Sequence, residues 1–414
     1  MSTKVPGWVV NPNTKLEFVP LGRLVRLRNE KNDPIRMTQV LSLTADRGVI
    51  RYEDKGAVGN NASEDISRYS IVRKGDIVVN SMNVIIGSVG LSKYDGVLSP
   101  VYYVLTPLEN DLVDMRYLAY HFQVKSFQQS LIRIGYGILD HRMRIPWINL
   151  KAELIALPPL EEQRRIADYL DQQVPRIDQA VLLFRRQLAT SSLAFMSKVE
   201  HQTSARLNPA DPFRRFRRLG KVDPITSIAG LEGDVTFLGL EDVQPGKLGD
   251  FSNTRNVDGV SSGYSRFKSG DILIPKVSPS FGHGRAVVAT ALVSSVGFAS
   301  TEVYVFRSND PGDWDYICGS FRARDFLLAG EATYQGVAGV KRVDRDFILD
   351  WPIRWPDRQT REAVAAKIQK GQQDLENLDF KTDVAVASLR ELRSSLITAA
   401  VTGTFDVTTG RSVA

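Results

Sequence analysis

Two short loops carry side chains that could recognise another molecule. Each loop follows a strand-like run opened by Gly-Asp-Ile, which begins at Gly75 in the first half of the chain and at Gly270 in the second. Amide and hydroxyl groups can pair with the edges of DNA bases, and a lysine can donate to the acceptors of guanine. The loop residues that we predict to contact DNA are Asn80, Ser81, Asn83, Lys276, Ser278, Ser280, His283 and Arg285. An ordinary variable turn is the alternative interpretation.

A basic segment with aromatic or amide neighbours comes later in each half. Arg144 and Arg342 occupy matching places in these segments. Such a group fits contact with phosphates combined with some readout of bases. The residues that we predict to contact DNA here are Arg133, Tyr136, His141, Arg142, Arg144, Tyr334, Gln335, Lys341 and Arg342. A solvated basic surface is the alternative interpretation.

Residue types that support catalysis are present, but their spacing does not fit catalysis. The four histidines and Cys318 are scattered along the chain, and none lies at the spacing of zinc ligands from another. The sequence contains no phosphate-binding Gly-x-x-x-x-Gly-Lys-Ser/Thr loop and no Gly-x-Gly-x-x-Gly after a strand. No nucleophile, base and orienting group can be assembled. We therefore expect a non-catalytic chain without a metal or cofactor of its own.

The recognition residues belong to an internal repeat. Tyr69-Ser70 before Gly75-Asp76-Ile77 returns as Tyr264-Ser265 before Gly270-Asp271-Ile272, and Tyr103-Val104 returns as Tyr304-Val305. A repeat unit of this length is a whole domain with its connector, because solenoid units have about 20–50 residues. The chain therefore reads as two similar modules that meet two related objects.

Each module begins with a turn-rich region that contains short β-type runs. The runs 77–79, 101–105, 272–274 and 303–306 predict strands. Amphipathic helices are expected over 115–129 and 313–328. We read both regions as globular α+β domains.

A long helix is predicted after each globular region. Pro158-Pro159 ends the first region, and apolar residues then recur at steps of three, four or seven from Ile166 to Phe195. A similar seam follows Trp355-Pro356 and includes Leu378, Thr382 and Leu392. Two such helices would most simply pair in an antiparallel coiled coil, whereas packing of each on its own globular domain is the alternative. Pro175 is expected to kink the first helix or to separate its first turns.

These observations predict a domain order with pseudo-two-fold internal symmetry. We expect a first globular domain over 1–155, a long helix over 156–202, a linker over 203–212, a second globular domain over 213–353, a second long helix over 354–405 and a tail over 406–414.

Composition sets outer limits on the function. The chain has 414 residues, more than one ordinary core, and a net charge of +6, which fits a surface that binds a polyanion. Its one cysteine cannot form an intramolecular disulfide, which permits a reducing compartment. Residues 1–20 lack the apolar core of a signal peptide, and the weakly polar stretch 286–299 is too short to span a bilayer. We expect a cytoplasmic location without membrane contact.

One segment resembles a known family. Residues 157–166 read Leu-Pro-Pro-Leu-Glu-Glu-Gln-Arg-Arg-Ile, which is similar to the segment that opens the long helices of type I restriction–modification specificity subunits. The runs from Gly75 to Met82 and from Gly96 to Tyr102 also resemble the target-recognition domains of that family. The second copy, from Trp355 to Arg361, departs from the pattern because it has lost one proline and both glutamates.

The resemblance implies a definite role. Each α+β domain would be a target-recognition domain for one half of a split double-stranded DNA site, and the paired helices would fix the unread spacer between the halves. Two methyltransferase subunits, which use S-adenosylmethionine, would dock on the helices. Two restriction/translocase subunits, which use ATP and magnesium, would complete a complex for phage defence. The residues that we predict to bind the partner are Leu160, Glu161, Glu162, Gln163 and Ile166.

Two other functions remain open from the residues alone. The chain could be a coiled-coil scaffold whose paired modules bind protein partners. It could also be the specificity subunit of a related type II-like system. DNA binding would separate the first of these from the function that the resemblance implies.

Overall fold

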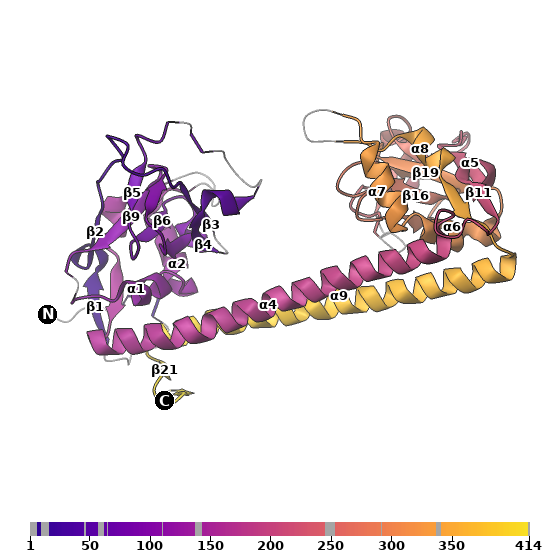
Figure 1. The fold of residues 1–414 in the computed structure, drawn as a ribbon. Coiled ribbons are helices and arrows are strands. Elements are labelled where there is room, and N and C mark those ends of the chain that lie inside the picture. Colours follow the sequence, from indigo (N-terminus) through magenta and orange to yellow (C-terminus); the bar gives the residue numbers. More distant parts are fainter. Residues whose placement is uncertain are drawn as a thin grey trace. The chain divides into compact units, whose positions relative to one another are not determined.

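The fold is taken from a computed structural model that describes residues 6–9, 16–44, 47–56, 62–63, 65–109, 111–136, 143–244, 253–290, 292–336 and 341–412. The chain divides into two compact units, one formed by Met1–Leu182 with Ala385–Ala414 and the other by Leu183–Val384. Figure 1 shows the elements of both units in the colours of the sequence. Each unit is described by itself.

Up to residue 157, the described part of the first unit contains a four-stranded antiparallel sheet and three separate strand pairs. The sheet has the order β2 (Val25–Leu27), β9 (Tyr102–Pro107), β6 (Ile77–Asn80) and β7 (Val89–Leu91). The pairs are β1 (Glu17–Pro20) with β10 (Leu154–Leu157), β3 (Leu41–Thr44) with β4 (Gly48–Arg51), and β5 (Ser70–Val72) with β8 (Gly96–Leu98). The predicted strands over 77–79 and 101–105 are confirmed as β6 and β9.

The second unit repeats the four-stranded sheet and adds a second one. The repeated sheet has the order β12 (Gly220–Val222), β19 (Val303–Ser308), β16 (Ile272–Pro275) and β17 (Val287–Val288). The other sheet has the order β14 (Thr254–Asn256), β13 (Asp234–Leu238), β18 (Gly297–Ala299) and β15 (Ser265–Phe267), and β11 (Phe213–Arg215) pairs with β20 (Pro352–Arg354). The predicted strands over 272–274 and 303–306 are confirmed as β16 and β19.

Each expected amphipathic helix is in fact two short helices. Helix α1 (Met115–His121) is followed by α2 (Lys125–Ser130), and α6 (Trp314–Ser320) by α7 (Arg324–Ala332). The prediction of one helix was wrong because Phe122, Val124 and Phe127 are all fully buried. Positions 122 and 124 would lie on nearly opposite faces of a continuous helix, so the chain must turn to bury both.

Short helices complete the two units. They are α3 (Trp147–Leu150), α5 (Phe216–Leu219) and α8 (Arg345–Asp350), with 3-10 turns at Leu21–Arg23, Tyr52–Lys55, Val84–Ile86, Leu131–Ile134, Val257–Gly259 and Pro311–Asp313. The C-terminal residues form the strand pair β21 (Phe405–Asp406) and β22 (Arg411–Ser412).

The Gly-Asp turn before β6 is built around a buried aspartate. Gly75 has a φ of 93°, a conformation that glycine adopts without a steric penalty. The Asp76 carboxylate accepts the Arg73 backbone N–H at 2.8 Å and two hydrogen bonds from the Arg28 guanidinium, at 2.8 and 3.0 Å. Arg28 also donates to the Thr106 hydroxyl at 3.2 Å.

The turn before β16 repeats this arrangement. Gly270 has a φ of 88°, and the Asp271 carboxylate accepts the Lys268 backbone N–H at 2.7 Å. Arg307 donates to both Asp271 oxygens, at 2.7 and 2.6 Å, and to the Thr226 hydroxyl at 3.1 Å. The repeated Gly-Asp-Ile sequence therefore records the same buried ion pair in both units.

Two long helices run through both units. Helices α4 (Leu160–Thr203) and α9 (Arg358–Val401) have 44 residues each, which corresponds to a length of about 66 Å. Helix α4 continues through Pro175, so the expectation that this proline could separate the first turns was wrong. No helix in the described part of the chain is both long and apolar enough to cross a membrane.

Segments of α4 and α9 pack antiparallel within each unit, as predicted (Figure 1). In the first unit Arg393 donates to Asp178 at 3.0 Å, and the start of α4 meets the end of α9. In the second unit Arg185 pairs with Asp383 at 3.1 Å, and Phe195 lies against Gly371. Thr382 is buried as expected, but Leu392 is exposed, because Val386 and Ile397 take the inward positions instead.

The first core contains a histidine that burial keeps neutral. His121 packs edge-on against the rings of Trp8 and Phe127, which also contact each other, and its Nε2 accepts the Ala156 backbone N–H at 3.2 Å. Burial disfavours the charged imidazolium and lowers the pKa of His121 to about 3. The unfolded chain, whose histidine pKa is near 6.5, therefore binds a proton that the folded chain excludes.

Acid should weaken the fold through His121. Its folded pKa is depressed, so stability is full above about pH 6.5 and falls as the pH drops toward 3. From about pH 7.5 to 5.5 the free energy of unfolding should fall by about 1.4 kcal/mol more in the wild type than in His121→Gln. Urea unfolding of both proteins at the two pH values measures this difference. Equal pH dependence would contradict a neutral His121.

Candidate nucleic-acid interface

In the first unit the predicted loop and the predicted basic segment meet. The loop after β6 offers the Ser81 carbonyl to the Ile145 backbone N–H at 2.9 Å. The Ile145 carbonyl in turn accepts the Tyr103 hydroxyl at 3.0 Å. Tyr136 and Arg144 exchange two backbone hydrogen bonds of 2.9 Å, and both side chains are exposed. We call the described residues of this segment, Tyr136 with residues 143–144, the first arm. His141 and Arg142 lie outside the described residues.

The second unit builds the same arrangement from different residues. The Lys276 carbonyl accepts the Val343 backbone N–H at 2.8 Å, and the Val343 carbonyl accepts the Tyr304 hydroxyl at 3.1 Å. Gln335 and Arg342 exchange backbone hydrogen bonds of 3.0 and 2.8 Å, and we call the described residues 335–336 and 341–342 the second arm. Ser81 and Lys276 therefore occupy equivalent places, each where a strand of the sheet passes into a loop beside an arm.

Some of the predicted loop residues in the first unit are accessible and one is not. Asn80 and Asn83 are half-buried, and the Asn80 side-chain oxygen accepts the Met82 backbone N–H at 3.0 Å. Ser81 is only 2% exposed, so the prediction that its side chain reads a base is not supported: the arm covers it. Met82 and Ile86 are exposed in the same turn, and the sequence analysis missed them because apolar residues carry no recognition signal by themselves.

The predicted loop in the second unit is a tight turn beside the arm. Ser278 donates its backbone N–H to the Lys341 carbonyl at 2.9 Å. The Lys276 ammonium lies 5.0 Å from the centre of the Tyr304 ring, and His283 is exposed while Arg285 is half-buried. Ser280 is buried, so the structure does not support its predicted contact with DNA.

The remaining predicted residues differ in how accessible their side chains are. Arg133 donates two hydrogen bonds to the buried Glu153, at 3.0 and 2.7 Å, which fixes its guanidinium against the first unit. The Tyr334 hydroxyl is buried and has no hydrogen-bond partner among the described residues. Gln335 and Lys341 are exposed.

Arg342 has a partner that the sequence analysis missed. Its Nε and Nη2 donate to the two Glu302 carboxylate oxygens at 2.9 and 2.5 Å. These hydrogen bonds hold the pKa of Glu302 below its usual range, so its carboxylate is charged at neutral pH. Glu302 lies just before β19, far from Arg342 in sequence, so only the fold brings the two together.

The predicted partner-binding residues face both inward and outward. Gln163 is buried: its side-chain oxygen accepts the Asp114 backbone N–H at 2.9 Å, and its Nε2 donates to the Pro158 carbonyl at 2.8 Å. Ile166 is also buried, in the first core. The prediction that these two bind a partner is corrected, because both hold the start of α4 on its own domain. Leu160, Glu161 and Glu162 remain accessible at least in part.

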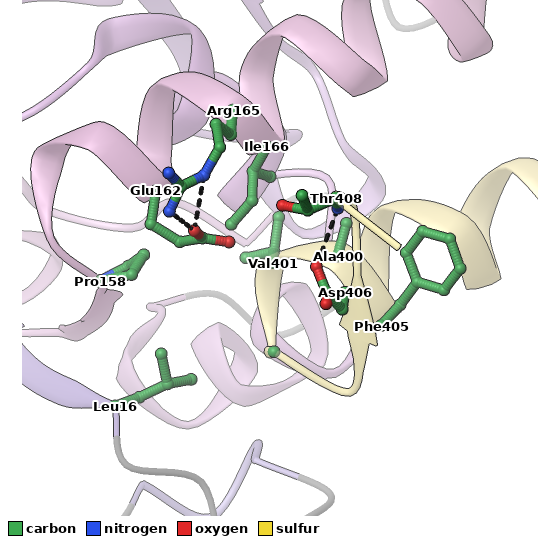
Figure 2. A pocket seen from close by; sticks show the side chains of 11 residues that line it. Leu16, Pro158, Glu162, Arg165, Ile166, Ala400, Val401, Phe405, Asp406 and Thr408 are labelled. Atoms are coloured by element: carbon green, nitrogen blue, oxygen red, sulfur yellow. Dashed lines mark hydrogen bonds and ion pairs between the residues drawn. The ribbon is translucent and has the colours of Figure 1, made fainter. Parts of the chain in front are cut away.

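A pocket of about 530 Å³ lies between the start of α4 and the end of α9 in the first unit. Figure 2 shows that Glu162 and Arg165 pair on one side of it while Phe405, Asp406 and Thr408 line the other. The Arg165 Nε donates to Glu162 at 3.0 Å. This pocket places Glu162 beside the C-terminal segment.

The start of α9 uses a different contact from the start of α4. Arg361 donates to the buried Asp313 at 2.9 Å, and its guanidinium lies 4.3 Å from the centre of the Trp355 ring. Asp357 accepts the Thr360 backbone N–H at 2.9 Å and caps the helix. The segment from Trp355 to Arg361 departs from the family pattern, so its side chains make different contacts from those at the start of α4. A long helix nevertheless begins here.

Among the described residues no three histidines, cysteines or acidic residues form a group that could hold a metal ion. The arrangement can instead present amides, cations and hydroxyls from a loop and an arm on the surface of each unit. These are the groups that bind phosphates and base edges.

Comparisons with known proteins fit this arrangement. Residues 34–179 match the model of the type I restriction modification DNA specificity domain. The chain is 28% identical over 188 residues to the type I restriction enzyme EcoAI specificity subunit of Escherichia coli, covering 43% of this chain and 32% of that protein. It is 30% identical over 145 residues to the EcoEI specificity subunit of the same organism, covering 33% and 24%. The chain thus spans a third or less of the length of these two relatives.

The fold has a counterpart among solved structures. A chain from a study of complex assembly and conformational transition of the type I R-M system has a TM-score of 0.64 and 16% identity, with coverage of 93% of this chain and 97% of that one. At this identity the likeness concerns the fold, and it confirms the predicted α+β class with its long helices. The match over residues 34–179 and the two relatives confirm the resemblance of this chain to type I restriction–modification specificity subunits.

Proposed function

We propose that this chain is the sequence-specific DNA-recognition subunit of a type I restriction–modification complex. Each α+β domain reads one half of a two-part target. The observation that carries this proposal is that a strand-end loop and an arm are built twice on the same backbone contacts, with different side chains. The exposed side chains of Tyr136 and Gln335, which occupy equivalent places in the two backbone pairs, show this difference most directly. Different side chains on equal scaffolds suit an asymmetric target.

The chemistry of the two surfaces supports DNA as the ligand. Arg144 and Lys341 are exposed cations on the arms, and Gln335 adds an exposed amide. Cations beside amides combine phosphate contact with hydrogen bonds to base edges. A net charge of +6 acts in the same direction. Binding should weaken steeply with salt, because each neutralised phosphate contributes a slope of about −0.9.

The long helices suit docking of partners and spacing of the half-sites. Several large apolar side chains on them are exposed to solvent, which is unfavourable unless a partner covers them. In the second unit these are Leu183, Phe184, Leu193, Phe380 and Val384. We assign catalysis to the partners: two methyltransferase subunits with S-adenosylmethionine, and two motor-nuclease subunits with ATP and magnesium. The chain itself is then non-catalytic and acts in the cytoplasm.

Exchanging residues 212–350 for the same region of a relative should change only one half of the methylated motif. The exchanged segment begins after the end of α4 and stops before the start of α9, so both long helices stay intact. Long-read methylome sequencing of a host that carries the operon measures the motif. A change in both halves would contradict one domain per half-site. A band shift of the purified complex with specific DNA separates this function from a protein-binding scaffold.

Lengthening both helices together should lengthen the spacer of the target. Residues 185 and 383 pair, as do 195 and 371, so seven residues inserted after Leu188 need a matching insertion after Leu378. Seven residues add about 10 Å, or about three base pairs of DNA. Methylome sequencing reads the spacer length directly.

A single insertion after Leu188 is the matched control for this experiment. It shifts the antiparallel register of the helices and should abolish methylation. An unchanged spacer in the double insertion, with activity retained, would rule out the helices as the ruler.

A further inference from the structure

Glu302 holds Arg342 of the second arm by hydrogen bonds that leave one edge of its guanidinium without a partner among the described residues. Glu302 takes one hydrogen on Nε and one on Nη2, at 2.9 and 2.5 Å. A guanidinium carries five N–H donors in one plane. The edge formed by Nη1 and the second hydrogen of Nη2 therefore keeps two parallel donors. The Arg342 side chain as a whole is 48% exposed.

The pairing also changes what Arg342 is suited to bind. A carboxylate beside the guanidinium offsets its positive charge and repels phosphate, so the pair is a weak general contact for the DNA backbone. The direction of the remaining donors is fixed, because two hydrogen bonds hold the planar group. A fixed pair of donors without much net charge fits a neutral acceptor pair. The O6 and N7 atoms of guanine in the major groove form such a pair.

The first unit lacks this device. In the internal repeat Ser99 and Tyr103 match Ser300 and Tyr304, so Val101 stands in the place of Glu302. Val101 is 56% exposed and cannot accept a hydrogen bond through its side chain. Arg144, which matches Arg342, is exposed without an ion pair among the described residues. The arm of the second unit therefore presents an arginine whose direction is fixed by an ion pair. The arm of the first unit presents an arginine without such a pair among the described residues.

The scaffold around the pair is rigid enough to transmit this orientation. Glu302 lies in the turn that precedes β19, and its carbonyl accepts the Lys276 backbone N–H at 2.9 Å. The backbone of Arg342 forms hydrogen bonds with the backbone of Gln335. The next residue, Val343, donates its backbone N–H to the Lys276 carbonyl. Both ends of the ion pair are thus fixed to the same strand end.

We propose that Glu302 is a specificity-determining positioning residue, which orients Arg342 to donate two hydrogen bonds to a guanine in the half-site of the second domain. This inference rests on the proposed function and adds to it one base, the arginine that reads it and the glutamate that orients that arginine. Arg144, without such a partner, contacts phosphate.

The test compares variants in the full complex with its methyltransferase partners. The complex is incubated with a pool of duplexes randomised in both half-sites, and the bound DNA is sequenced. Arg342→Lys keeps the charge and loses the fork, so it should lower the preference for guanine at one position about 5- to 150-fold. Glu302→Gln should lower the same preference while binding to non-specific DNA stays equal or rises, because a negative charge is lost. The other half-site should not change.

Two controls separate this outcome from general damage. Asp350→Asn removes a carboxylate from another exposed arginine pair of the same unit, the contact with Arg217, and should leave both half-sites unchanged. Arg144→Lys should alter affinity without changing base preference.

Each other outcome overturns the inference. A uniform loss of affinity in Arg342→Lys would show that Arg342 contacts phosphate. Tighter DNA binding with an unchanged base preference in Glu302→Gln would show that Glu302 only neutralises the charge of Arg342. A second half-site without a guanine on either strand would also overturn it. If the wild-type complex selects no motif at all, the proposed function itself fails, and this result is distinct from the others.

Discussion

Asp76 and Asp271 are almost inaccessible to water, with 3% and 2% exposure, and each carries a charge that the fold must satisfy. Removing one partner from such a buried pair typically costs about 3–5 kcal/mol, because the remaining charge is left uncompensated. The arginine and the backbone N–H that satisfy each aspartate fix the turn before β6 and β16. Those strands end at the loops beside the arms, so the position of each proposed recognition surface depends on this pair.

The two units keep this arrangement while exchanging the residues that make it. In the first unit the arginine follows β2 and the threonine lies in β9, as Arg28 and Thr106. In the second unit the threonine follows β12 and the arginine lies in β19, as Thr226 and Arg307. The ion pair and the hydrogen bonds are the same in both units, although the arginine and the threonine have exchanged places. A repeat can therefore preserve an interaction that its aligned sequences hide.

The helix starts show the same freedom. Gln163 ties the start of α4 to the backbone of Asp114, and Arg361 ties the start of α9 to the side chain of Asp313. At the start of α4 the amide oxygen of Gln163 accepts a backbone N–H. At the start of α9 the guanidinium of Arg361 supplies a counter-charge to a buried carboxylate. The outer faces of these two starts consequently differ, with Glu161 and Glu162 on the first and Asp357 with Arg358 on the second. Partners that dock on both would meet unequal surfaces.

The sequence by itself determined the duplication, the α+β class, the two long helices and the strands around the loops, because these depend on periodicity and on local turn residues. It also placed the loops and arms in one functional set, since their chemistry fits a common ligand. Only the tertiary structure decided which of those side chains are accessible. Ser81, Ser280, Gln163 and Ile166 are all buried. Local pattern carries no information on such contacts between distant segments, and for the same reason only the fold could bring Glu302 to Arg342.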